Sequence, residues 1–154
     1  IEPGNVRRVI RALEVFRQHG VPISRLQRKR PPPYRILIVG LTRPMESLEQ
    51  RIAQRVDAML AAGLVDEVRS LVERGYSYDL PAMSGIGYRE VGMFLRGEIT
   101  LPEARLLIIR KTRRFVRRQY QWFRLSDPAI HWFNLDEAGA PAAINRQIAL
   151  FLAG

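Results

Sequence analysis

The sequence predicts a helix-rich α/β fold with about two strands of a parallel sheet. A short, continuous apolar run rich in β-branched residues spans 34–41, which is typical of a strand buried on both faces of a parallel sheet, and residues 130–135 form a second candidate strand. Most of the remaining chain shows apolar residues at helical spacing. Because each parallel strand needs a neighbour for its backbone groups, we expect further strands outside these 154 residues.

The first element is a helix predicted from Val6 to His19. Asn5 can cap its N-terminus, its apolar side chains recur at 3.6-residue spacing, and Gly20 can end it. The segment 21–33 then combines basic residues with three prolines, which lack an amide donor and disfavour helix before them. We therefore expect a linker there, dividing the chain into residues 1–33 and 34–154.

Five more helices follow the first strand. The apolar spacing and the glycine stops place them at about 46–60, 64–72, 89–96, 100–125 and 140–152. Thr100 and Glu103 have the spacing of a capping box and open the longest of these helices. Residues 76–88 are expected to form a loop.

Composition narrows the class of protein. Lys+Arg number 25 against 15 Asp+Glu, which gives a net charge of +10, and Lys29 and Lys111 are the only lysines. Arginine grips phosphate through a planar bidentate fork. The absence of cysteine excludes disulfides, zinc fingers and cysteine nucleophiles. No run approaches the roughly 18 apolar residues of a membrane span. Since the chain begins at Ile1 without a signal peptide, we expect a piece of a longer, cytoplasmic protein.

The longest helix carries the strongest functional pattern. Its basic residues are Arg105, Arg110, Lys111, Arg113, Arg114, Arg117, Arg118 and Arg124, with no acid between 105 and 125. Such a stripe destabilises an isolated helix, so we expect an anion to compensate it, although a solvated basic face is an alternative. Interleaved glutamine and aromatic residues favour RNA, because aromatic and guanidinium planes can hold an unstacked base.

Two weaker patterns accompany it. The loop 84–89 contains two glycines before a helix, which is compatible with a ligand-binding turn or with a plain tight turn. Arg51 and Arg55 lie one helical turn apart after the first strand and form either a phosphate clamp or a solvated face. His19 and His131 are isolated, and no Walker A or other self-sufficient catalytic motif occurs, so we assign no catalytic residue and no metal ligand here.

Six sequence runs occur in an order that resembles one enzyme family. They are Arg11-Ala12-Leu13-Glu14-Val15, Ile38-Val39-Gly40-Leu41-Thr42, Arg51-Ile52 with Arg55-Val56-Asp57, residues 61–68, Gly87-Tyr88-Arg89-Glu90 and residues 117–124. Together they resemble the C-terminal half of bacterial tRNA dimethylallyltransferases, over almost the whole chain to about Trp132. That family transfers a dimethylallyl group from its diphosphate to N6 of the adenosine next to the tRNA anticodon.

The resemblance implies a P-loop nucleoside-kinase-like fold with a helical insertion that grips the anticodon stem-loop. Residues 1–33 would close that insertion, and residues 34–154 would be the C-terminal part of the core. The P-loop, expected to bind nucleotide such as ATP, the catalytic aspartate and Mg²⁺ belong to the N-terminal half, which these residues do not include. We therefore expect the chain alone to bind tRNA weakly, as a monomer, and to be inactive.

The resemblance also assigns site residues. Those expected to contact tRNA are Arg7, Arg8, Ser84, Gly85, Ile86, Gly87, Tyr88, Arg89, Arg117, Arg118, Gln119, Tyr120, Gln121, Trp122, Phe123 and Arg124. Arg51 is expected to hold the diphosphate. The chain departs from the family pattern at Glu2, Gly4, Asn5, Arg7 and Ser84. Two other functions stay open: a non-catalytic basic RNA-binding module and a P-loop kinase of small nucleotides, which would not need the basic helix.

Overall fold

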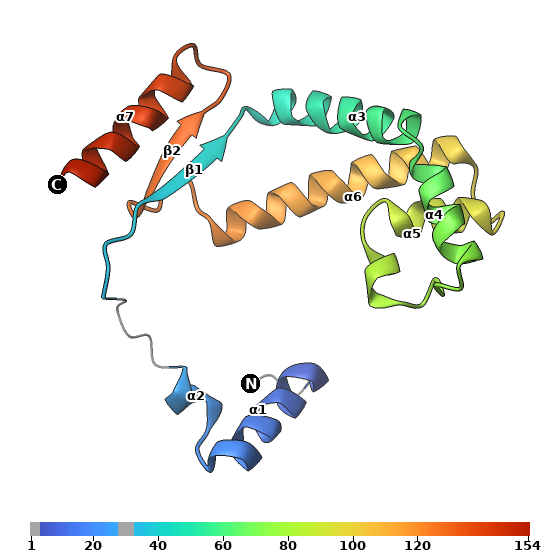
Figure 1. The fold of residues 1–154 in the computed structure, drawn as a ribbon, viewed down its shortest axis with the longest axis horizontal. Helices are drawn as coiled ribbons and strands as arrows, with labels where there is room; N and C mark the ends of the chain where they lie inside the picture. Colours follow the sequence, from blue (N-terminus) through green and yellow to red (C-terminus); the bar gives the residue numbers. More distant parts are fainter. Residues whose placement is uncertain (1–3, 28–32) are drawn as a thin grey trace. The chain divides into compact units, whose positions relative to one another are not determined.

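The computed structural model describes residues 4–27 and 33–154 and divides the chain into two compact units, residues 1–36 and 37–154 (Figure 1). In the first unit, α1 (Val6–His19) begins at Asn5, whose side chain accepts a hydrogen bond from the Arg8 amide at 3.2 Å. It ends at Gly20, whose φ of 67° lies in the left-handed region that glycine tolerates. The predicted bounds of this helix are confirmed.

The predicted linker contains one more element than expected. A single-turn helix, α2 (Ile23–Leu26), follows Pro22, and the Pro22 carbonyl accepts a hydrogen bond from the Arg25 amide at 2.9 Å. Proline suits this position because its ring presets φ and its missing amide would have no helical partner there. The rest of the linker prediction, residues 28–32, lies outside the described residues.

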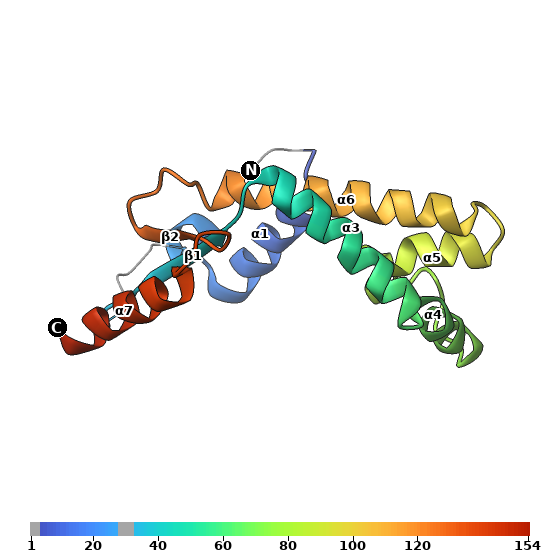
Figure 2. The same ribbon diagram turned by 90° about the horizontal axis from the view of Figure 1, so that it is seen from above.

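The core of the second unit lies among its helices. These are α3 (Met45–Ala61), α4 (Leu64–Glu73), the 3₁₀ turn η1 (Pro81–Ser84), α5 (Tyr88–Leu95) and α6 (Leu101–Trp122). The helix α6 packs against both α3 and α5, as Figures 1 and 2 show. One buried cluster joins α3 to α6 through Ile52, Val56, Ile108 and Ile109, and a second joins Leu64, Val68, Met83 and Val91. All five predicted helices of this unit are present, the last being α7 (Ala140–Ala153).

Two strands form the sheet. β1 (Ile38–Thr42) and β2 (Ile130–Asn134) pair directly and in parallel, with Gly40 opposite Trp132, so the two predicted strands are each other's neighbours. The expectation that the first strand is buried on both faces is wrong for this chain: Ile38 is 42% and Leu41 55% exposed. The reason is that α6 borders one face of this two-stranded sheet and α7 makes only limited contact with β2.

The longest helix is shorter than predicted at its C-terminal end. It ends at Trp122 rather than near Leu125, and Phe123 leaves helical geometry with ψ of 85°. Beyond it the Arg124 carbonyl accepts hydrogen bonds from the Trp132 indole at 3.2 Å and from the Asp127 amide at 3.0 Å. The Arg124 carbonyl therefore bonds to a turn amide and to a distant indole instead of to an amide one helical turn later, as it would if α6 continued.

The capping box of α6 gives an acid-dependent contribution to stability. The Glu103 carboxylate accepts hydrogen bonds from the Thr100 amide at 2.7 Å and from its hydroxyl at 2.8 Å, and both lower the pKa of Glu103. Because the pKa is lower in the folded than in the unfolded chain, this stabilisation is present above the unfolded value and is lost as pH falls through the folded one. We expect Glu103→Gln to flatten the acid side of a plot of Tm against pH, measured by circular dichroism.

The partner residue provides the comparison for this prediction. Thr100→Ala removes the hydroxyl contacts of the same box and is expected to cost about 1 kcal/mol of stability. It should also weaken the acid dependence, since the Glu103 carboxylate loses one of its donors. A Glu103→Gln protein with an unchanged acid-side decline in Tm would contradict this role of the capping box.

Candidate nucleic-acid interface

The structure sorts the basic residues of α6 into two groups. Four of them have acidic partners on neighbouring helices: Arg105 pairs with Asp57, Lys111 with Glu90, and both Arg113 and Arg117 with Glu49. The Arg113 and Arg117 guanidinium nitrogens lie 3.3 and 3.9 Å from the Glu49 carboxylate. Part of the compensation that we expected from an external anion therefore comes from the chain itself.

The second group forms a continuous exposed row. Arg110, Arg114 and Arg118 follow one another at four-residue spacing, are exposed, and have no acidic partner within residues 4–27 and 33–154. Trp122 continues the same spacing and is 81% exposed. Side chains four apart share one helix face, so we call Arg110, Arg114, Arg118 and Trp122 the arginine stripe. Guanidinium forks ending at an exposed indole suit RNA phosphates and an unstacked base.

Residues 117–124, predicted to contact tRNA, are divided by the structure between two environments. Arg118, Gln121 and Trp122 are exposed, whereas the Tyr120 hydroxyl shares a 2.7 Å hydrogen bond with the Thr42 hydroxyl at the end of β1. The Tyr120 ring also lies 6.3 Å from the Trp132 ring, measured between centroids. Tyr120 thus ties α6 to the sheet.

Part of this segment also borders a cavity. Gln119, Tyr120 and Phe123 line a hollow of about 400 Å³ between α6 and the two strands, which is also lined by residues 38–43. Beyond the end of the helix, Arg124 is exposed and its carbonyl holds the Trp132 indole. Gln119, Tyr120 and Phe123 therefore border the sheet side of the segment, whereas Arg118, Gln121 and Trp122 are exposed to solvent.

The predicted loop 84–89 is hydrogen-bonded to the residues on either side of it. The Ser84 hydroxyl donates to the Pro81 carbonyl at 2.6 Å, and Gly87, whose φ is 104°, donates its amide to the buried Glu90 carboxylate at 2.7 Å. Gly85 and Ile86 are exposed. Only glycine adopts the Gly87 conformation without strain. The loop therefore presents the exposed Gly85 and Ile86 between two hydrogen-bonded ends.

A second hollow lies beside this loop. It measures about 580 Å³ and is lined by Ser84 and Arg89 of the loop together with Tyr78 and Arg96. The Arg96 guanidinium stacks on the Tyr78 ring at 4.4 Å, and its hydrogen bond to Glu98 raises the pKa of Arg96. Tyr88 donates its hydroxyl to Glu67, which raises the pKa of Tyr88. Arg89 is exposed and lines this hollow together with Arg96 and the acidic Asp79.

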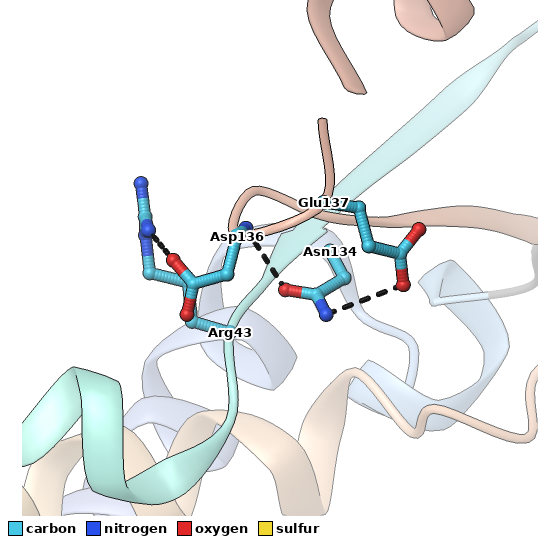
Figure 3. Close-up of polar contacts among 4 residues, drawn as sticks. All are labelled: Arg43, Asn134, Asp136 and Glu137. Atoms are coloured by element: carbon cyan, nitrogen blue, oxygen red, sulfur yellow. Dashed lines mark hydrogen bonds and ion pairs between the residues drawn. The ribbon is translucent and has the colours of Figure 1, made fainter. Parts of the chain in front are cut away.

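The arginine predicted to hold a diphosphate lies on α3, the helix that follows β1. Arg51 is exposed on α3, and Leu48, one turn earlier, lines the hollow between α6 and the sheet. The segments after β1 and β2 are joined by an ion pair between Arg43 and Asp136, as Figure 3 shows, and by the Leu135 amide, which donates to the Thr42 carbonyl at 2.9 Å. In open α/β sheets ligands bind at this edge.

Side-chain hydrogen bonds shape the loop that follows β2. The Asn134 side-chain oxygen accepts from the Asp136 amide at 3.1 Å, and its amide group donates to Glu137 at 3.3 Å (Figure 3). No cluster of three or more histidine, aspartate or glutamate side chains suited to a metal ion occurs in the part of the chain that the structure describes. Over the same residues, no helix is long and apolar enough to cross a membrane.

The predicted residues are only partly brought together. The Glu90–Lys111 ion pair connects the loop 84–89 to α6, whereas Arg7 and Arg8 are exposed on α1 in the other unit. Arg110 and Arg114 were not among the residues assigned to tRNA. Their four-residue spacing with Arg118 is visible in the sequence, but the pairing of their neighbours with Glu49 and Glu90 is not.

The fold and the surface together define an α/β protein with a two-stranded parallel sheet. Its longest helix carries an exposed row of arginines. A sequence profile of the IPP transferase family matches residues 1–126. The chain belongs to this family.

Individual relatives agree with the profile. A tRNA dimethylallyltransferase of Dehalococcoides mccartyi is 48% identical over 145 residues, covering 94% of this chain and 45% of the relative. One from Roseiflexus castenholzii is 55% identical over 124 residues, covering 80% of this chain and 40% of the relative. This chain thus spans about half the length of the curated relatives it matches.

Solved structures show the same fold. The tRNA isopentenylpyrophosphate transferase of Bacillus halodurans superposes with a TM-score of 0.69 at 37% identity, covering all of this chain and 46% of that protein. The tRNA Δ(2)-isopentenylpyrophosphate transferase of Staphylococcus epidermidis superposes with a TM-score of 0.72 at 29% identity, covering 100% and 51%. These structures have a P-loop-like fold, and the predicted helix-rich α/β class with two parallel strands is confirmed.

Proposed function

We propose that this chain is the tRNA-gripping C-terminal portion of a tRNA dimethylallyltransferase. The complete protein would transfer a dimethylallyl group from its diphosphate to N6 of the adenosine next to the anticodon, acting as a monomer in the cytoplasm. Family membership and the names of the relatives support the enzyme class. The arginine stripe is the observation in this chain that carries the tRNA part of the proposal.

The stripe suits RNA better than a small ligand. Its three exposed arginines repeat every four residues, or about 6 Å of helix axis, so the row can meet several phosphates of one nucleic acid at once. The exposed Trp122 at its end provides a face on which an unstacked base can lie. A kinase of small nucleotides would use one phosphate site and has no need of a row of this length.

The reaction divides into tasks that these residues can and cannot perform. An exocyclic amine is a weak nucleophile, so a general base must assist its deprotonation while cations neutralise the departing diphosphate. We propose Arg51 for the diphosphate, because it is an exposed arginine on α3, the helix that follows β1. No general base is assigned in this chain. The described residues contain no cluster of three or more acidic or histidine side chains that fits the family's expected Mg²⁺.

Binding of a labelled anticodon stem-loop tests the tRNA part. We expect fluorescence anisotropy to show binding whose affinity falls steeply with salt, because several phosphates would be neutralised at once. A linear oligonucleotide that contains the same loop sequence but cannot form the stem serves as the matched RNA. A salt-independent affinity, or equal affinity for the two RNAs, would count against a tRNA-gripping role.

Label transfer tests the enzymatic part. We expect no transfer from radiolabelled dimethylallyl diphosphate to tRNA by the 154 residues alone. We expect transfer when they replace the matching segment of the Dehalococcoides mccartyi relative, which is 48% identical over that segment. A folded chimera that binds both tRNA and dimethylallyl diphosphate but transfers nothing would favour a non-catalytic RNA-binding module.

A further inference from the structure

We propose that Glu90 is a positioning residue that holds the loop 84–89 and the arginine stripe in one fixed arrangement, through its contacts with Gly87 and Lys111. The inference rests on the proposed tRNA-binding function and adds a residue to it. Glu90 lies outside the sixteen residues assigned to tRNA above, and its side chain cannot touch RNA because it is fully buried, at 0% exposure.

The contacts of Glu90 link two separate segments. One carboxylate oxygen accepts the Gly87 amide at 2.7 Å, and the other accepts the Lys111 ammonium group at 2.5 Å. Gly87 is part of the predicted tRNA loop and has a positive φ. A backbone conformation of this kind persists when surrounding contacts fix it, and here the contact is the hydrogen bond to Glu90. Lys111 comes from α6, so a single side chain connects loop backbone with helix.

The helix end of this link lies next to the arginine stripe. Lys111 is followed three and seven residues later by Arg114 and Arg118, which places the three side chains on adjoining parts of one helix face. Movement or rotation of α6 relative to the loop would shift Arg114 and Arg118 relative to Arg89. The Glu90–Lys111 pair opposes that movement directly.

Burial of this carboxylate has no evident packing advantage. Glu90 is the one charged side chain fully buried among the described residues, and the contacts that its carboxylate makes are with the Gly87 amide and the Lys111 ammonium group. Burying an ion pair is often no more stabilising than an apolar pair of the same shape, so its retention is better explained by a geometric requirement. The two hydrogen bonds to loop and helix supply that requirement.

A charge-neutral double variant separates positioning from stability. Glu90→Gln with Lys111→Met removes one acid and one base, so the net charge and the general attraction to RNA stay the same. An apolar side chain beside a neutral amide is expected to keep the fold, because no uncompensated charge is buried. We expect a folded protein whose Tm does not exceed the parental value, because the introduced amide buries an N–H donor beside an apolar side chain, while the Kd for the labelled anticodon stem-loop rises about tenfold.

A matched control removes another helix–helix ion pair. Asp57→Asn with Arg105→Met is also charge-neutral and breaks the exposed contact between α3 and α6. We expect its stem-loop affinity to stay within about twofold of the parent chain. The single variant Glu90→Gln adds one net positive charge, so simple electrostatics would strengthen its RNA binding, whereas loss of positioning weakens it.

A double-mutant cycle with Arg89 completes the test. If Glu90 acts by placing the loop, the loss caused by Arg89→Ala should be largely absent in the Glu90→Gln/Lys111→Met background, because the misplaced arginine no longer contributes. Additive losses, or parental affinity in a stable double variant, would overturn the positioning role. Failure of the parent chain itself to bind the stem-loop would instead overturn the proposed function.

Discussion

Replacing Arg114 and Arg118 with alanine should lower the affinity for the anticodon stem-loop by at least about a hundredfold at low salt. Each exposed guanidinium would lose charge-assisted hydrogen bonds to phosphate, worth about 1.5–3 kcal/mol apiece. The salt dependence should change as well, since the slope of log K against log salt falls by about 0.7–0.9 for every phosphate no longer neutralised. Fluorescence anisotropy over a salt series measures both quantities.

The control for this prediction removes the same charge elsewhere. Arg69 and Arg105 are paired with Asp66 and Asp57, so Arg69→Ala with Arg105→Ala also lowers the net charge by two. General electrostatic attraction would weaken both double variants alike, whereas a phosphate-binding row weakens the Arg114/Arg118 variant far more. Equal losses in affinity and in salt slope would show that the arginine stripe has no special role.

Exposed arginines such as Arg114 and Arg118 and ion-paired arginines such as Arg69 and Arg105 cannot be told apart from the sequence. This is the limit of sequence-based prediction for the site. The sequence identifies α6 as basic and places its start at Thr100, because charge and a capping box are local properties. It cannot separate Arg113 from Arg114, since both lie near the same helix face. Their separation depends on Glu49 of α3, which is distant along the chain and pairs with Arg113 and Arg117.

A similar limit applies to the fold. The second strand and most helix bounds follow from apolar spacing and glycine stops and are confirmed, whereas the first strand begins at Ile38 rather than at residue 34. The early end of α6 depends on the Trp132 indole, which donates to the Arg124 carbonyl. The exposure of β1 depends on how many elements cover the sheet. Both are long-range properties, and helical or strand periodicity contains no information about them.

Gly40→Ala should destabilise the sheet by about 2 kcal/mol, the usual size of an overpacking effect. A Cβ at this position would lie 2.5 and 2.6 Å from two carbons of the Trp132 indole and 2.8 Å from an Ile130 methyl carbon. The indole cannot move freely, because its nitrogen donates to Arg124 and its ring lies beside Tyr120. Urea unfolding followed by Trp132 fluorescence, in a Trp122→Phe background that leaves one tryptophan, measures the loss.

The same change should also reach α6. Displacing the Trp132 indole weakens its hydrogen bond to the Arg124 carbonyl, which lies just beyond the last turn of α6 and therefore beside the end of the arginine stripe. Gly85→Ala is the matched control, because its φ is −60° and its added carbon would lie 3.5 Å from the Ala82 carbonyl oxygen. We expect that control to change stability by less than about 0.5 kcal/mol. A Gly40→Ala protein that unfolds at the parental urea concentration would show that the indole can shift without cost, and that the sheet does not fix the end of α6.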